Sequence, residues 1–392
     1  MNNFQYYTPT KVVFGKDTEK QAGELVKEQK CNKVLVHYGT GSVKRSGLLD
    51  RVYASLDAAG ISYVSLGGAV PNPRLSLVYE GIELCKKEGV DFILAVGGGS
   101  AIDSAKAIGY GVKYDGDVWD LYLKKEIPTD MLPLGVILTI AATGSEMSNS
   151  SVITNEEGWL KRGLNCDLSR PRFAIMNPEL TYTLPEYQTM SGCTDILMHT
   201  MERYFSHEMD TDLVDGMAET LLKSVMRAAK VLLKNPKDYN ARAEVLWAGS
   251  LSHNGLTGCG RAGDWACHQL EHELGGMFDV AHGAGLAAVW GSWARYVYEA
   301  DVARFAKFAV NVMGIPYDYA EPKKTVLAGI EAMEDFFRSI HMPVNIHELG
   351  VELTDEQIEE LAYKCSYMEQ RTIGGIRKLG REDIARIYEM AR

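Results

Sequence analysis

Strand-like and helix-like segments alternate along the first half of the chain, and this alternation limits the fold more than any other feature of the sequence. Four short apolar runs have the pattern of buried strands: 33–38, 63–66, 92–96 and 135–140. Amphipathic segments such as 48–59 and 75–88 lie between them and predict helices. Strands joined through helices run parallel, so we predict an α/β domain with a mostly parallel sheet over residues 1–184.

From residue 185 to Arg392 the apolar residues recur at helical spacing, and no further strand pattern occurs. We therefore predict an all-α domain over residues 185–392. No stretch has the uninterrupted apolar length of a membrane span, and the first residues lack the apolar core of a signal peptide. We expect no membrane partner and a cytoplasmic location.

The charge balance argues against nucleic acid or a membrane surface as the main partner. The chain carries 41 basic and 52 acidic residues, a net charge of −11. Nucleic-acid phosphates and anionic lipid headgroups repel such a surface. The seven cysteines include no CxxC pair, so we expect reduced thiols in a cytoplasm-like compartment rather than a disulfide framework or a zinc ribbon.

A glycine-rich turn, Gly97-Gly98-Gly99-Ser100, follows the predicted strand at 92–96 and leads into a predicted helix. This arrangement aims backbone N–H groups and the positive end of a helix dipole at a phosphate. The usual dinucleotide fingerprint GxGxxG is not met, because its third glycine would fall on Ile102. A tight turn with no ligand is therefore an open alternative.

The strand at 33–38 ends in a second candidate loop, Gly39-Thr40-Gly41-Ser42, followed by Lys44 and Arg45. NAD-binding sites commonly place an acidic side chain here to hold the ribose hydroxyls. Glycine, hydroxyl and cationic residues would instead accept a 2′-phosphate, which favours NADP(H); a solvated Lys–Arg pair would leave the same pattern. The segment 139–146 adds hydroxyl groups after a strand and is either a plain turn or part of the cofactor site.

Five residues of the helical half are candidate metal ligands. Asp195 and His199 lie four apart on one helix face, as do His268 and His272, and His282 follows. A carboxylate with imidazoles suits zinc or ferrous iron. An Asp–His pair at this spacing is also common as a buried hydrogen-bonded pair. The other histidines have no clustered partner and are expected to be structural or exposed: His37, His207, His253, His341 and His347.

The segment 268–272 also matches HxxEH, the inverted zinc-protease signature, in which both histidines bind zinc and Glu271 is the base. That interpretation would leave the α/β half without a role. A metal combined with a nicotinamide cofactor points instead to hydride chemistry on an alcohol or aldehyde.

Segments along nearly the whole chain carry one combined pattern: PTKVVFG at 9–15, PNPR at 71–74, GGGSAIDSAK at 97–106, ATGSEMS at 142–148, Asp195 with His199, CHQLEHEL at 267–274 and AHGAGLA at 281–287. In this pattern the chain resembles the iron-containing (group III) alcohol dehydrogenases, specifically the NADPH-dependent butanol dehydrogenase branch. The resemblance implies an α/β domain with a mostly parallel, Rossmann-like sheet followed by an all-α domain, the dehydroquinate synthase-like fold.

The resemblance also implies roles for individual residues. The metal, Fe(II) or Zn(II), would be held by Asp195, His199, His268 and His282, and His272 would lie near the nicotinamide and help to move the proton. The cofactor pattern falls on Gly39, Gly41, Ser42, Asn72, Gly98, Gly99, Ser100, Asp103, Thr139, Thr143 and Lys161. NAD-using relatives carry an aspartate where this chain has Gly39, which agrees with NADP(H). The expected substrates are small aldehydes and primary alcohols, and the expected assembly is a homodimer.

Two other functions are alternatives. A metal lyase of the dehydroquinate synthase kind uses NAD without net redox change and needs a basic cluster for its phosphorylated substrate, for which 259–264 offers only Arg261. A non-catalytic nucleotide sensor would have no need of four intact metal ligands. Apolar and aromatic residues such as Met147, Trp265 and Phe278 suggest a small apolar aldehyde as the substrate.

Overall fold

The computed structural model describes all 392 residues, which form two compact units. The α/β unit comprises Tyr7–Leu184, and the helical unit comprises Pro185–Arg392 together with Met1–Tyr6. The expected α/β domain, which starts at residue 1, therefore begins six residues too early. The first residues pack on the helical unit, where the Asn2 N–H donates to the Gly260 carbonyl at 2.8 Å. Sequence periodicity does not report such a contact between distant segments.

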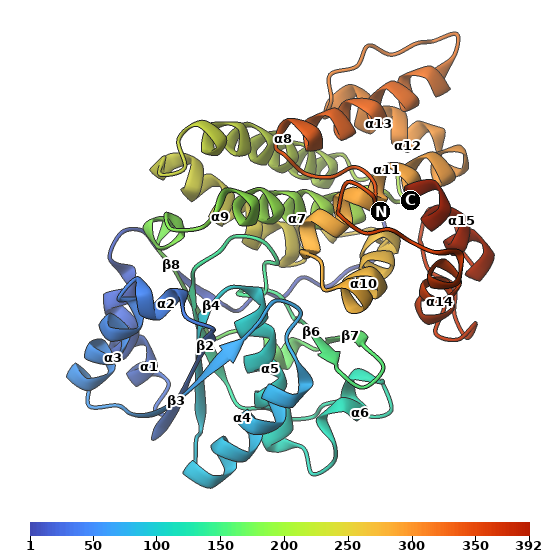
Figure 1. Cartoon of the computed structure of the whole chain (residues 1–392). Coiled ribbons are helices and arrows are strands. Elements are labelled where there is room, and N and C mark those ends of the chain that lie inside the picture. Colours follow the sequence, from blue (N-terminus) through green and yellow to red (C-terminus); the bar gives the residue numbers. More distant parts are fainter. The chain divides into compact units, whose positions relative to one another are not determined.

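Six parallel strands form the central sheet of the α/β unit (Figure 1). They are β1 Lys11–Phe14, β2 Lys33–Gly39, β3 Ser62–Ala69, β4 Phe92–Gly97, β5 Leu134–Leu138 and β8 Phe173–Met176. They lie in the order β1–β8–β5–β4–β2–β3, which confirms the mostly parallel sheet. All residues of β4 and β5 are buried, because helices cover both faces of a parallel sheet.

Helices pack on both faces of this sheet. The helices of the α/β unit are α1 Ala22–Glu28, α2 Ser42–Arg45, α3 Leu48–Ala58, α4 Leu75–Glu88, α5 Gly99–Lys113 and α6 Val118–Tyr122. Phe92, Leu94 and Val96 of β4 join one apolar cluster with residues of α1 and α3. The alternate residue Ile93 faces Gly109 of α5, since successive side chains of a strand point to opposite faces.

Four strands are absent from the sequence-based expectation: β1, β8, and the antiparallel hairpin of β6 Ser150–Asn155 and β7 Leu160–Asn165. β1 and β8 have four residues each, and β1 is partly exposed. A strand this short gives little hydrophobic periodicity. β7 carries Lys161 and Arg162 at buried positions, so its polar sequence conceals a buried strand.

The helical unit contains no strand, which confirms the all-α second domain. Its helices are α7 Glu186–Tyr204, α8 Asp212–Lys234, α9 Tyr239–His253, α10 Ala266–Phe278, α11 His282–Val297, α12 Val302–Asn311, α13 Pro322–Ser339, α14 Asp355–Cys365 and α15 Arg381–Ala391. α7 and α11 are buried almost all round, as expected for helices at the centre of a unit. None of the helices combines the length and the apolar character that crossing a bilayer would need.

A close approach of α7 and α11 positions two of the expected metal ligands. Gly283, at the start of α11, lies against Ser191 of α7, and a Cβ added to Gly283 would lie 2.0 Å from the Ser191 carbonyl oxygen. Only glycine permits this approach. As a consequence, His282 lies beside Asp195, which is one turn along α7 from Ser191.

Candidate functional site

Three of the four expected metal ligands come together in the helical unit. Asp195, His268 and His282 each offer one ligand atom, and these atoms lie within 4.8 Å of one another. The Oδ1 atom of Asp195 lies 3.6 Å from Nε2 of His282 and 3.9 Å from Nε2 of His268. Ligand atoms about 2.1 Å from a tetrahedral ion lie about 3.4 Å apart. The spacing therefore suits one ion bound by all three.

His199, the fourth expected ligand, lies at the edge of this group. Its Nδ1 atom is 3.3 Å from Oδ1 of Asp195, and its ring centroid is 4.6 Å from that of His268. It is nevertheless not a member of the three-ligand group. Nδ1 of His199 and Nε2 of His268 are both buried without a hydrogen-bond partner. Because leaving such an atom unsatisfied costs about 1–3 kcal/mol, a bound metal ion fits the residues present.

Two buried carboxylates accept hydrogen bonds from the imidazoles of His268 and His282. Oε1 of Glu202 accepts hydrogen bonds from Nδ1 of His268 and from the His268 N–H, both at 2.9 Å. A carboxylate oxygen of Glu271 accepts from Nδ1 of His282. Each bond fixes the tautomer, so that Nε2 carries the lone pair and points to Asp195, as in many metal sites.

Glu202 is not among the expected site residues, although the sequence contains a signal for it. Asp195, His199 and Glu202 follow one another at intervals of four and three residues, which places all three on one face of α7. This spacing does not show whether Glu202 binds the ion or supports an imidazole. The answer depends on how α7 packs against the start of α10, which cannot be read from the sequence.

The imidazole of His199 is held in its neutral form. Burial lowers the pKa of His199 well below its usual value, and the neighbouring rings of His253 and His268 lower this pKa further. A neutral imidazole keeps the lone pair that a metal ion needs. The ring of His253 lies 4.1 Å from that of His199, so the expectation that His253 has no clustered partner is wrong.

The protease interpretation of 268–272 does not fit this arrangement. Of the two histidines, His268 belongs to the three-ligand group and His272 does not. Glu271, which would be the catalytic base, is buried and bonded to His282. His272 is half-buried, and its ring centroid lies 6.0 Å from that of His282. It therefore lies next to the candidate ligands without joining them.

Replacing Glu202 with glutamine should weaken metal binding by about tenfold to a hundredfold, because the neutral amide supports His268 less well than a carboxylate does. Titration calorimetry with Zn(II) on metal-stripped protein measures this affinity. Glu360→Gln is the matched control, since Glu360 pairs only with Lys364 on the surface of α14. Equal affinities for the Glu202 variant and the control would contradict the supporting role.

In the α/β unit, the glycine-rich turn connects β4 to α5. Helix α5 begins at Gly99 with Gly98 as its N-cap and no side-chain cap, so its first N–H groups can bind an anion. A Cβ on Gly98 would lie 2.1 Å from Ile140, and one on Gly99 would lie 2.5 Å from Thr143. The loop after β5 thus crosses directly over the turn, and both positions require glycine.

The other expected cofactor residues follow the carboxyl ends of neighbouring strands, the edge at which open parallel sheets bind nucleotides. Gly39 is the last residue of β2, and Gly41 and Ser42 follow that strand. Asn72 follows β3, Ser100 follows β4, and Thr139 and Thr143 follow β5. Lys161 lies on β7 opposite Thr154, whose N–H donates to the Pro73 carbonyl at 2.8 Å. The hairpin therefore joins the same edge beside Asn72.

Asp103 has a different place from the other expected cofactor residues. It is buried, and its two carboxylate oxygens accept hydrogen bonds from the Ser145 hydroxyl at 2.6 Å and the Val152 N–H at 2.9 Å. One turn along α5, the fully buried Lys106 ammonium donates to the carbonyls of Ser145, Ser148 and Ser150 at 2.8–3.0 Å. Both side chains therefore hold the loop that carries Thr143.

Burial shifts the pKa of both members of this pair. It raises the pKa of Asp103 above its usual value, although the nearby Lys106 ammonium opposes that shift. It lowers the pKa of Lys106 to about 8, while Asp103 and Glu146 favour the charged form. The ammonium is thus kept by its anionic neighbours and its three carbonyl acceptors.

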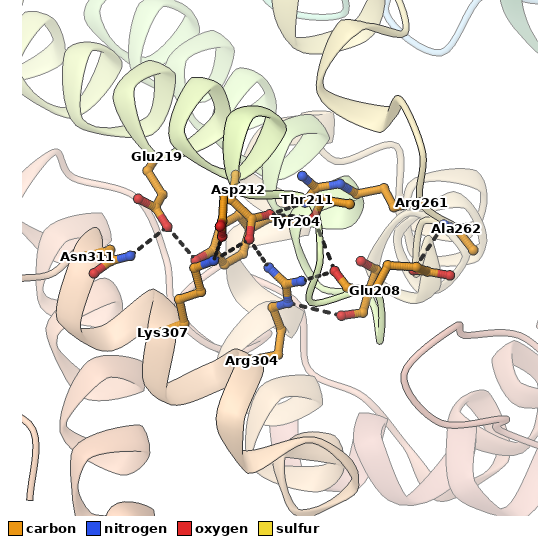
Figure 2. Close-up of polar contacts among 12 residues, drawn as sticks. Tyr204, Glu208, Thr211, Asp212, Glu219, Arg261, Ala262, Arg304, Lys307 and Asn311 are labelled. Atoms are coloured by element: carbon orange, nitrogen blue, oxygen red, sulfur yellow. Dashed lines mark hydrogen bonds and ion pairs between the residues drawn. The ribbon is translucent and has the colours of Figure 1, made fainter. Parts of the chain in front are cut away.

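The basic residue required by the lyase interpretation is engaged elsewhere. The Arg261 side chain is fully buried, and its Nη1 lies 2.7 Å from Oδ1 of Asp215. Asp215 also pairs with Arg304 and Lys307 at 2.8 and 2.6 Å. Figure 2 shows Arg261 and Arg304 entering the same polar cluster beside Glu208. Arg261 is therefore not exposed to a phosphorylated substrate.

Comparison with known proteins gives consistent matches over both units. Residues 9–178 match the family model described as iron-containing alcohol dehydrogenase, and residues 189–392 match the C-terminal model of the Fe-containing alcohol dehydrogenase family. The probable NADH-dependent butanol dehydrogenase 1 of Bacillus subtilis is 40% identical, over 99% of each chain. The NADPH-dependent aldehyde reductase YqhD of Escherichia coli is 33% identical over the full length of both. The crystal structure of NADH-dependent butanol dehydrogenase A from Thermotoga maritima has a TM-score of 0.96 at 38% identity, covering 100% of this chain and 99% of that one.

Proposed function

Because the chain belongs to the iron-containing alcohol dehydrogenase family, we propose that it reduces small aldehydes to primary alcohols, reversibly, with NADP(H) and one divalent ion, Fe(II) or Zn(II). Membership of the family implies an alcohol or aldehyde oxidoreductase with a nicotinamide cofactor and a divalent metal. The observation that carries the proposal is the group of Asp195, His268 and His282, whose imidazoles are backed by Glu202 and Glu271.

The residues of the site have separable tasks in this reaction. A divalent ion bound by Asp195, His268 and His282, with His199 as a fourth ligand, would supply Lewis acidity toward an alcohol or carbonyl oxygen. Glu202 and Glu271 keep two of the imidazoles oriented and in one tautomer. His272, half-buried one turn along α10 from His268, is assigned the exchange of a proton with the substrate oxygen.

The proposed preference for NADP(H) rests on the end of β2 and the residues that follow it. Gly39 offers no carboxylate to the ribose, and the exposed Ser42, Lys44 and Arg45 follow it. Such residues favour a 2′-phosphate. The names of the relatives divide on this point, since those from B. subtilis and T. maritima specify NADH and that from E. coli specifies NADPH. The cofactor therefore has to be tested on this chain.

Replacing Gly39 with aspartate should lower the ratio of NADPH to NADH efficiency by about tenfold or more, because the carboxylate repels a 2′-phosphate. The position accepts a side chain, since a Cβ there would lie 3.4 Å from the Ala69 carbonyl oxygen. Values of kcat/KM for the two cofactors with butanal measure the ratio. Gly39→Asn is the control, because asparagine has nearly the size of aspartate but no charge. An unchanged ratio in the aspartate variant, or the same change in both variants, would show that the assignment of NADP(H) as the preferred cofactor is wrong.

The proposed function is tested by following NADPH oxidation with butanal as the substrate. One alcohol should form for each NADPH consumed, and the reverse reaction should proceed with butanol and NADP. No consumption of NADPH or NADH with any small aldehyde, by folded and metal-loaded protein, would reject the oxidoreductase proposal and favour a lyase that recycles its cofactor.

A further inference from the structure

Trp265 holds a left-handed backbone conformation immediately before α10. Its φ and ψ angles are 65° and 8°, a region that bulky side chains rarely adopt and that costs free energy. Such a conformation persists only where the surroundings impose it, and strained residues of this kind concentrate at functional sites. The neighbours of Trp265 show what imposes the conformation and where the indole is directed.

The peptide before Trp265 is tied to the support of the candidate metal ligands. The buried carboxylate of Asp264 accepts from the N–H groups of Gly375 and Ile376, both at 2.8 Å. The Asp264 N–H donates to the carbonyl oxygen of Glu202 at 2.7 Å, and the Glu202 side chain holds His268. The main chain at Trp265 is therefore fixed to α7 at the residue that orients a ligand imidazole.

The indole stands against the imidazole cluster. Its ring centroid lies 5.3 Å from that of His268 and 6.4 Å from that of His199, in edge-to-face orientations. The Arg203 guanidinium lies 4.5 Å from the indole centroid. A Cβ on Gly263 would lie 2.5 Å from the indole nitrogen, so a glycine makes room for the ring. The ring thus has one defined place beside the ligands.

Exposure indicates the side from which a substrate reaches the ligands. The side chains of Asp195, His199 and His268 are at most 5% exposed. The His282 side chain is 23% exposed, and Trp265 is half-buried. His282 and Trp265 are thus among the side chains beside the ligand atoms that a substrate can reach, and the indole offers an apolar surface.

We propose that Trp265 forms a wall of the substrate pocket beside the metal ligands and limits the size of the aldehyde that the enzyme accepts. This inference rests on the proposed function and names the residue that sets its substrate range. The carbonyl end of the substrate lies at the ligand group, and its alkyl chain packs against the indole. Short unbranched aldehydes fit this space, while bulky ones meet the ring.

The test compares Trp265→Ala and Trp265→Phe with the unmodified enzyme. Alanine keeps a Cβ and hence the backbone strain, so the variants differ only in the ring. The ratio of kcat/KM for benzaldehyde to that for butanal should rise at least about tenfold in the alanine variant, with a higher KM for butanal. It should stay within about threefold in the phenylalanine variant. Trp247→Ala is the control, because Trp247 is exposed and lines a separate cavity of about 670 Å³ between α8 and α9.

Two further measurements separate a wall from a structural support. Zn(II) affinity by calorimetry should stay within about threefold in Trp265→Ala, because the ring binds no ion. A large loss of Zn(II) affinity, with the rates for both aldehydes falling equally, would show that Trp265 supports the metal site and does not limit substrate size. Binding of benzamide relative to butyramide, measured on Zn(II)-loaded protein, should shift in the same direction as the aldehyde ratio. An unchanged ratio of benzamide to butyramide binding would show that Trp265 does not limit ligand size. This binding test applies even if the enzyme is inactive. If the amide binding ratio shifts but the unmodified enzyme reduces no aldehyde, the proposed function is refuted and the role of Trp265 in limiting ligand size is retained.

Discussion

Replacing His268 with alanine should lower the rate of aldehyde reduction by at least about a thousandfold, since a catalytic metal supplies several kcal/mol to the transition state. His268 provides one of the three gathered ligand atoms, and its Nε2 is buried without any other partner. The substitution also removes the Nδ1 donor that Glu202 accepts. NADPH binding should be largely retained, because every expected cofactor residue lies in the α/β unit. Steady-state rates and cofactor fluorescence measure the two effects.

His347→Ala is the control for this variant. The His347 side chain is 69% exposed and contacts only Glu352 at the surface, so its loss should leave the rate within about twofold. Substantial turnover in the His268 variant would show that the ligand assignment is wrong. Loss of turnover together with loss of NADPH binding would point instead to general unfolding, which circular dichroism detects.

Replacing Lys106 with methionine should destabilise the protein by about 3–5 kcal/mol, the usual cost of removing one partner from a buried ionic network. The substitution leaves the carbonyls of Ser145, Ser148 and Ser150 without their donor and leaves Asp103 buried without its nearby cation. Because two of these carbonyls, those of Ser145 and Ser148, belong to the loop that follows Thr143, NADPH affinity should fall as well. Urea unfolding gives the free energy, and the melting temperature should drop by about 10 °C.

Lys113→Met, on the same helix, supplies the comparison. Lys113 is exposed, and its Nζ lies 3.9 Å from Asp130, so its replacement should change the stability by less than about 0.5 kcal/mol. If both methionine variants unfold at the same urea concentration, the three carbonyl contacts of Lys106 contribute nothing measurable, and another interaction must hold the loop.

The sequence predicts the architecture well because the central strands are buried on both faces. β4 and β5 consist wholly of buried residues, and a continuous apolar run between helices has few other interpretations. The edge strand β1 and the polar hairpin strand β7 escape prediction, since the first is short and the second places Lys161 and Arg162 at buried positions. Packing of Met1–Tyr6 on the helical unit escapes it too, because that contact depends on the tertiary fold.

Some residues of the candidate site could also be predicted from the sequence, and others could not. Asp195 and His199 are visible from their spacing along one helix, as are the glycines that let the loop after β5 cross the turn. The carboxylates that orient the imidazoles are not, because Glu202 and His268 lie 66 residues apart and meet only when α7 packs against α10. Likewise, a sequence motif cannot separate Asp103, which holds a loop, from residues that line the cofactor edge.

Whether the reaction depends on a metal ion is measured as the rate of NADPH oxidation with butanal, by metal-stripped protein and by the same protein reconstituted with Fe(II) or Zn(II). Stripping should remove turnover, one of the two ions should restore it, and NADPH should still bind to the stripped form. Full activity in protein shown to contain no metal would show that the reaction needs no metal ion and that Asp195, His268 and His282 are not catalytic ligands.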